Sequence, residues 1–305
     1  MAMSEMPEGP VVVGFDPFAA AAQTLEVAAE EASAAGVPLL VVHVYGWPIL
    51  YASLANIPFV PEDWRPSPDA VATTEAAAAS LALAHPGLDV SVSVRVGRGG
   101  EQLVAASEHA SLLVVGATGA RGLSGLMTGS VTSYVATHAH CPVMVVRNAT
   151  IRARLSAEVC VGVDGTPSSL DALRFATGWA RRHGVGVRAL YAVDTFDEPV
   201  PEDGGHTLAE TRLHDWVSEG LASSDGTPIE VAVVRQAPAA ALVAASAAAR
   251  LVVVGSRHRG EFASRVLGSV GHSLVRRAGC PVVIVPDPFG VTPAPATVPA
   301  TEVRR

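Results

Sequence analysis

Two glycine-rich segments of the chain have the residue types and the placement that phosphate binding requires. The first segment, residues 116–130, contains Gly116, Gly119, Gly129 and Ser130. The second segment, residues 255–269, contains Gly255, His258, Gly268 and Ser269 at the matching positions. Glycine lets the backbone pass close to a ligand, and the first N–H groups of a helix attract an anion. Both segments follow an apolar run and enter a helical pattern at Gly-Ser, and the first, with all of its glycines, predicts phosphate binding at a helix N-terminus.

The two segments also belong to an internal duplication. The positions of the first glycines differ by 139 (255 − 116), and the cysteines before the next apolar runs, Cys141 and Cys280, differ by the same number. This matching offset indicates that a strand, a loop, a helix and a strand occur twice. We expect the two cysteines to pack as small apolar side chains where a buried strand begins.

The remaining elements must bring other residues to these loops. Apolar runs predict strands at 10–15, 37–45, 88–96, 111–115 and 142–146, and in the second copy at 159–164, 186–193, 229–235, 251–254 and 281–285. Helical patterns lie between the strands. The first is an alanine-rich stretch that ends near residue 35, and the others cover 68–85, 100–109, 130–139, 168–183, 207–222, 238–249 and 269–277. Either Ser168 or Ser169 is expected to cap the helix that begins at 168.

This alternation predicts an α/β fold with two tandem doubly wound domains, each a five-stranded parallel sheet with helices on both faces. The domains are expected at residues 1–147 and 159–286, joined by a linker at 148–158. Residues 287–305, rich in Pro, Ala and Thr, are expected to be a disordered tail. Right-handed crossovers place all strand C-terminal ends on one edge, so Asp16, after the first strand, should approach the loop that begins at Gly116.

The composition of the chain excludes some kinds of site and partner. The chain has 305 residues, a net charge of -8 and 49% hydrophobic residues, and all 21 of its basic residues are arginine. The absence of lysine from the sequence excludes a P-loop lysine and a Schiff base. The negative charge argues against nucleic acid as the main partner. We found no secretory signal and no apolar run long enough to span a membrane, so we expect a cytoplasmic protein.

On these residues, the chain resembles the tandem two-domain form of the universal stress protein family, whose fold is adenine nucleotide alpha-hydrolase-like. The family's ATP-binding pattern is Gly, two residues, Gly, nine residues, Gly and Ser/Thr, and the first copy matches it in full. The resemblance implies that Asp16 contacts the nucleoside near the base and that Val44 lines the adenine pocket. It also implies that the remaining residues contact ribose and phosphates: Gly116, Gly119, Gly129, Ser130 and Val131.

The second copy departs from this pattern at one position. The family's usual opening is present from Asp164 onward, and four residues of the later pattern match: Gly255, Gly268, Ser269 and Val270. His258, however, stands where the second glycine belongs, so its side chain either crowds the phosphates or donates a hydrogen bond to them. Whether the second copy binds nucleotide stays open at this point. The implied ligand is ATP or a related adenine nucleotide, with or without Mg.

The sequence gives less support to a metal site or a catalytic site than to nucleotide binding. His138, His140 and Cys141 lie close together, but a zinc site needs further ligands, so we expect no metal site. We identify no catalytic residues, and we expect a regulatory stress-response protein rather than an enzyme. A slow ATPase or phosphotransferase and a nucleotide-free scaffold are the alternatives. The resemblance also implies a homodimer, and a regulatory protein partner of unknown identity is expected. The apolar segment 46–66 should pack on its own domain, fold over the nucleotide crevice or cover a partner surface.

Overall fold

The computed structural model describes residues 9–17, 21–45, 66–117, 129–147, 158–193, 207–221, 227–256 and 267–286. Contacts divide the chain into two units, with the boundary between Val146 and Arg147. Gly119, His258, residues 46–65 of the apolar segment, the linker at 148–157 and the tail at 287–305 lie outside the described residues. The expected domain boundaries therefore stay a prediction.

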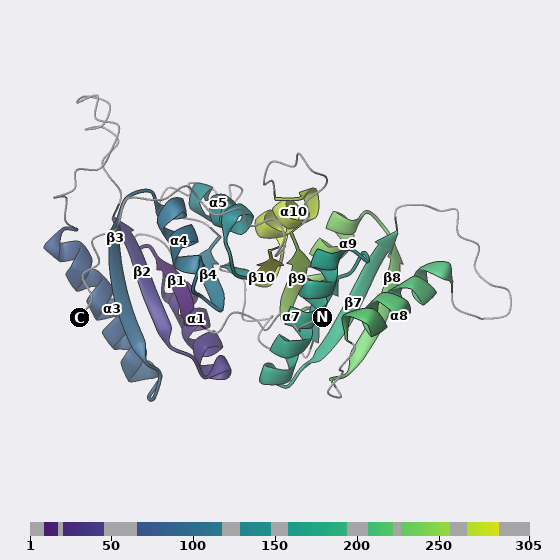
Figure 1. The fold of residues 1–305 in the computed structure, drawn as a ribbon, viewed down its shortest axis with the longest axis horizontal. Coiled ribbons are helices and arrows are strands. Elements are labelled where there is room, and N and C mark those ends of the chain that lie inside the picture. The colour runs from purple at the N-terminus through teal and green to yellow at the C-terminus, as the bar shows by residue number, and fades with distance from the viewer. Residues whose placement is uncertain are drawn as a thin grey trace, which may run out of the picture. The chain divides into compact units, whose positions relative to one another are not determined.

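The first unit contains a parallel sheet with the order β3-β2-β1-β4-β5. Its strands are β1 (Val11–Phe15), β2 (Leu39–Tyr45), β3 (Val90–Val96), β4 (Leu112–Gly116) and β5 (Val143–Val146). Its helices are α1 (Ala21–Ala35), α3 (Pro68–Ala84), α4 (Gly99–Ser107) and α5 (Ser130–His138). Helices α1 and α3 cover one face of the sheet, and α4 and α5 cover the other (Figure 1).

The second unit repeats this arrangement, with the order β10-β9-β6-β7-β8. Its strands are β6 (Glu158–Gly162), β7 (Gly186–Val193), β8 (Ile229–Arg235), β9 (Leu251–Gly255) and β10 (Val282–Val285). Its helices are α7 (Pro167–His183), α8 (Leu208–Gly220), α9 (Pro238–Ala245) and α10 (Ser269–Arg277). Helices α7 and α8 lie on one face and α9 and α10 on the other (Figure 1). The predicted fold class, two tandem doubly wound domains with five-stranded parallel sheets, is confirmed.

The cores form because the central strands are apolar on both faces. All four residues of β5 and of β10 are buried, as are the first four of β4 and β9. Such continuous Val/Leu runs are typical of parallel strands with helices on both sides. In each first strand a glycine makes room for a leucine from the helix above: Gly14 lies against Leu103, and Gly162 against Leu242. The two cores therefore share this packing detail.

The observed element ends differ from the predicted ones at several places. Strand β6 ends at Gly162, two residues before Asp164, and α9 ends at Ala245, four residues early. After α9 the chain tightens into turns, with hydrogen bonds from Ala247 N to Ala244 O and from Ala248 N to Ala245 O. The Ser246 hydroxyl adds a bond to Val243 O at 2.6 Å. Serine favours such local bonds over a continued helix.

A pair of serines shows how closely the units correspond. Ser107 donates to Val104 O at 2.6 Å and accepts from His140 N at 2.9 Å. Ser246 donates to Val243 O at 2.6 Å and accepts from Gly279 N at 2.9 Å. Both serines are 1% exposed, and each fastens the end of one helix to the turn before the last strand. The positions again differ by 139 (246 − 107), so the duplication extends to individual hydrogen bonds.

We expect Ser107→Ala and Ser246→Ala to destabilise their units by similar amounts, about 1–3 kcal/mol each, because each leaves a buried backbone N–H without its acceptor. Urea unfolding of the two variants measures this. Ser80→Ala is the control, because the Ser80 hydroxyl bonds to Ala76 O on an exposed helix surface. Unequal losses from the two buried serines would contradict their structural equivalence.

The cysteines behave as the sequence indicated. Cys141, Cys160 and Cys280 are free thiols and are buried. Burial raises the pKa of each of the three thiols to about 12, which keeps them protonated and unreactive at neutral pH. In the described part of the chain, no helix is both long and apolar enough to cross a membrane.

Candidate functional site

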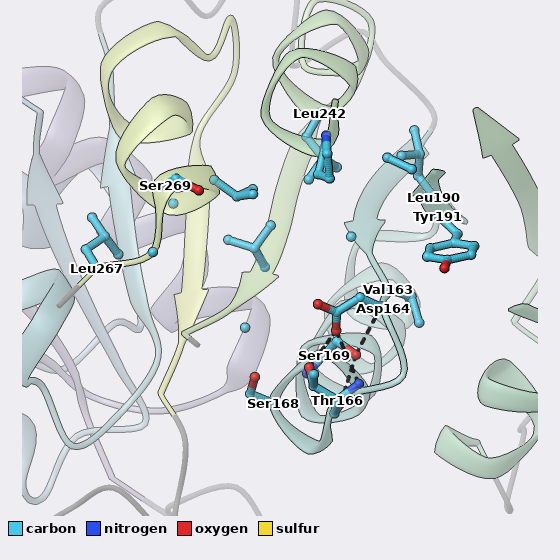
Figure 2. A pocket seen from close by; sticks show the side chains of 18 of the residues that line it. Val163, Asp164, Thr166, Ser168, Ser169, Leu190, Tyr191, Leu242, Leu267 and Ser269 are labelled. Carbon is cyan, nitrogen blue, oxygen red and sulfur yellow. Dashed lines mark hydrogen bonds between the residues drawn. The ribbon is translucent and has the colours of Figure 1, made fainter. Parts of the chain in front are cut away.

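A pocket opens at the C-terminal edge of the sheet in the second unit, where a doubly wound fold places its ligands (Figure 2). Its volume is about 500 Å³, within the range of small-molecule sites. Five residues predicted from the sequence line it: Asp164, Gly255, Gly268, Ser269 and Val270. The structure thus brings together residues from the ends of β6 and β9 and from the start of α10.

Asp164 is held in place by the first turn of α7. Its Oδ1 accepts hydrogen bonds from Thr166 N at 3.2 Å and from Thr166 Oγ1 at 2.5 Å. Thr166 is also the N-cap of α7, since its Oγ1 accepts from Ser169 N at 3.4 Å. The prediction that Ser168 or Ser169 caps this helix was wrong. Pro167 takes the first helical position, which requires no N–H, so the cap falls one residue earlier, at Thr166.

Two glycines of the second unit are required by packing. A Cβ on Gly255 would overlap the Ser168 carbonyl and lie 2.8 Å from Ser168 Oγ, so glycine allows α7 to approach the end of β9. Gly165 has φ +77°, and a Cβ there would lie 2.6 Å from Trp216 Nε1. Gly255 was expected to serve a ligand, which stays a prediction; what the structure shows is a role in packing helix on strand.

One end of the pocket is apolar and the other is polar. Leu190, Ala192, Leu242 and Val254 line it from β7, α9 and β9, and this surface suits a planar base. Thr166, Ser168 and Ser169 line it from the start of α7, and Gly268, Ser269 and Val270 from the start of α10. Both helix N-termini carry partial positive charge, which favours a negatively charged group in this pocket.

The first unit positions its predicted residues in the corresponding way. Strand β1 pairs in parallel with β2 and β4, with Phe15 opposite His43. Asp16, directly after β1, is therefore level with Val44 at the C-terminal edge of the sheet. Both residues are partly exposed there, as is Gly116 at the end of β4. The predicted base-binding residues and the start of the glycine-rich loop share one edge.

The start of α5 is anchored to the end of β4. The Thr132 hydroxyl donates to Gly116 O at 2.7 Å, and Gly129 N donates to Ala117 O at 3.1 Å. Gly129 is the N-cap and makes no side-chain capping bond. Ser130 and Val131 are exposed at this end of the helix. The first turn of α5 is thus hydrogen-bonded to the end of β4, while its two leading residues are exposed.

Sequence reasoning overlooked part of the pocket in the second unit. Thr166 and Ser168 line it, although the sequence indicated only helix capping for the serines of this stretch. A signal was available: aligning Asp164 with Asp16 sets Thr166 against Phe18 and Ser168 against Ala20. The polar start of α7 is therefore peculiar to the second copy.

No cluster of three or more His, Cys, Asp or Glu side chains in the described residues could hold a metal ion. His138 instead stacks on Tyr134, with ring centroids 4.2 Å apart, and its Nδ1 lies 2.8 Å from Tyr134 O. His140 Nε2 approaches Glu108 Oε1 at 4.0 Å. The two histidines thus have other neighbours.

The fold and the pocket define a tandem doubly wound α/β protein with a ligand site at the C-terminal edge of its sheet. The sequence model described as the universal stress protein family matches residues 9–147 and again residues 157–286. The chain therefore belongs to the universal stress protein family, in its tandem form, as its motifs suggested.

Individual relatives agree. A universal stress protein of Mycobacterium tuberculosis is 32% identical over 288 residues, covering 90% of this chain and 95% of that protein. The crystal structure of a universal stress protein from Archaeoglobus fulgidus covers 90% of this chain and 96% of its own, with a TM-score of 0.62 and 20% identity. This second likeness shows the fold alone. A universal stress protein solved in complex with cAMP covers 43% of this chain and 97% of its own, with 29% identity and a TM-score of 0.32, which is too low to indicate this chain's ligand.

Proposed function

We propose that this chain binds ATP or a related adenine nucleotide, with or without Mg²⁺, and acts as a regulatory module in a stress response. The observation that carries the proposal is the 500 Å³ pocket of the second unit, which has an apolar end and two helix N-termini. Such a pocket suits a ligand with a planar apolar part and an anionic part. The full ATP-binding pattern of the first copy extends the proposal to the first unit.

In this proposal each predicted residue has a defined task. Asp16 and Asp164 contact the nucleoside, and the second of these carboxylates is already oriented by Thr166. Val44, with Ala192 in its place in the second unit, lies against adenine. Gly129, Ser130 and Val131 in one unit, and Gly268, Ser269 and Val270 in the other, bind phosphate through the first turn of a helix. The two glycine-rich loops differ at the second glycine of the pattern, which is Gly119 in the first unit and is replaced by His258 in the second.

The nucleotide acts as a conformational ligand in this account, because the sequence contains no lysine and we identified no catalytic acid to promote its hydrolysis. A slow ATPase or phosphotransferase is the enzyme alternative, and a scaffold with empty pockets is the other. The proposal includes a homodimer, a regulatory protein partner and a cytoplasmic location, which rest on the resemblance and on the sequence.

A calorimetric titration of the purified chain with ATP tests the proposal, followed by a phosphate-release assay on the same sample. We expect saturable binding with phosphate release far slower than an enzymatic turnover of about 1 per second. The Asp16→Ala, Asp164→Ala double variant should lose binding while keeping its fold. Turnover at enzymatic rates would favour the alternative enzyme, and no binding to the parent chain would favour the scaffold.

A further inference from the structure

Ser168 is a mostly buried polar side chain with no hydrogen-bond partner among the residues that the structure describes. It is the second residue of α7, it lines the pocket of the second unit, and it is only 5% exposed. Its hydroxyl makes no hydrogen bond within the part of the chain that the structure describes. The side chain is thus mostly enclosed, and because it lines the pocket, its hydroxyl is open to a hydrogen-bond partner there.

The polar side chains next to Ser168 in the first turn of α7 already make hydrogen bonds to one another. Thr166 Oγ1 donates to Asp164 and accepts from Ser169 N, and the Ser169 hydroxyl donates to Thr166 O at 2.8 Å. Ser169 Oγ also accepts from Asp164 N at 3.3 Å. These bonds complete the cap of α7 without Ser168. The side chain of Ser168 is therefore not needed to start the helix.

The hydroxyl of Ser168 is directed into the pocket. It lies beside Gly255, since a Cβ added to that glycine would be 2.8 Å from Ser168 Oγ, and Gly255 itself lines the pocket. Figure 2 shows the Ser168 side chain turned away from α7 and toward the pocket interior. The hydroxyl is thus aimed at the place between the ends of β6 and β9 where a doubly wound fold holds its ligand.

The chemistry of this corner suits an oxyanion. Pro167 has no N–H, and Ser169 N donates to Thr166 Oγ1, so within the described residues the N–H and O–H of Ser168 are the donors left at this helix start. Both need an acceptor, and the helix dipole favours one with negative charge. The nearest carboxylate, Asp164, has its Oδ1 bonded to Thr166.

We propose that Ser168 and the N-terminus of α7 form a second oxyanion subsite in this pocket, in addition to the one at the N-terminus of α10. The proposal rests on the proposed nucleotide-binding function. Two subsites would make the second unit select adenine nucleotides with two or more phosphate groups over the monophosphate. The first unit lacks this subsite, because Ala20 is the sequence equivalent of Ser168.

The test uses the full chain with Gly119→Trp, which blocks the first loop so that binding reports the second pocket. AMP and ADP are titrated into this protein and into the same protein with Ser168→Ala. We expect Ser168→Ala to lower ADP affinity by about tenfold, the equivalent of about 1.4 kcal/mol, and to leave AMP affinity unchanged. Ser269→Ala, at the start of α10, is the matched control and should weaken both ligands alike.

Stability separates this effect from a structural one. Because the Ser168 hydroxyl has no hydrogen-bond partner among the described residues, we expect Ser168→Ala to leave the urea midpoint unchanged. Equal changes for AMP and ADP, or no change for either, would overturn the second subsite while leaving the nucleotide function in place. If the Gly119→Trp protein binds neither ligand, the subsite is also refuted, and the titration of the parent chain decides separately whether the proposed function fails.

Discussion

Gly255→Val should destabilise the second unit by about 3 kcal/mol, near the upper end of the usual cost of overpacking a core. A Cβ at this position would overlap the Ser168 carbonyl, which belongs to the first turn of α7 and is not a movable side chain. Either α7 moves away from β9 or the strand end distorts, and both changes disturb the pocket. We therefore expect the variant to lose nucleotide binding in the second unit as well as stability.

Urea unfolding followed by tryptophan fluorescence measures this effect. Two of the four tryptophans, Trp179 and Trp216, lie in the second unit, so a Trp47→Phe, Trp64→Phe background makes the signal report that unit. Gly178→Ala is the matched control, because a Cβ there would approach only Arg182, at 3.8 Å. We expect this control to stabilise α7 by about 0.5–1 kcal/mol. An unchanged midpoint for Gly255→Val would show that the close approach of α7 to β9 is wrong.

Gly119→Trp should weaken nucleotide binding in the first unit by about 100-fold, the equivalent of about 2.7 kcal/mol. The reason is the family pattern, in which this glycine brings the backbone against the phosphates, where a large side chain leaves no room. His258→Gly should leave binding in the second unit unchanged or strengthen it, because it restores the glycine that the pattern requires. Isothermal titration of ATP into each variant gives both affinities and the number of sites.

The two substitutions serve as controls for each other, since they occupy matching positions of the two loops. If His258→Gly abolishes binding while Gly119→Trp has no effect, the roles of the two sites have been assigned the wrong way round. Loss of binding in His258→Gly would be the result if the His258 side chain donates a hydrogen bond to a phosphate.

The fold was predictable because its determinants are local and repeated. Continuous apolar runs identified the buried strands, and the offset of 139 between Gly116 and Gly255 identified the duplication. Pairs such as Ser107 and Ser246 then show that equivalent residues make equivalent bonds. Element ends were less predictable, because α9 stops where Ser246 forms local bonds that compete with the helix.

The site was only partly predictable, because its missing parts depend on contacts between distant segments. The need for glycine at 255 comes from the carbonyl of Ser168, on a helix remote in sequence. The free hydroxyl of Ser168 could be recognised only after Thr166 was found to cap α7. Sequence spacing identified the residues at the ends of the strands. The roles of Gly255 and Ser168, in contrast, depend on how α7 packs against β9.

The most direct test of the nucleotide-binding account is to denature the purified full-length chain and to identify the small molecules it releases by mass spectrometry. The account predicts an adenine nucleotide, released from the parent chain and absent from the Asp16→Ala, Asp164→Ala variant. If the parent chain releases no adenine nucleotide and also fails to bind added ATP or ADP in a calorimetric titration, the central claim is contradicted.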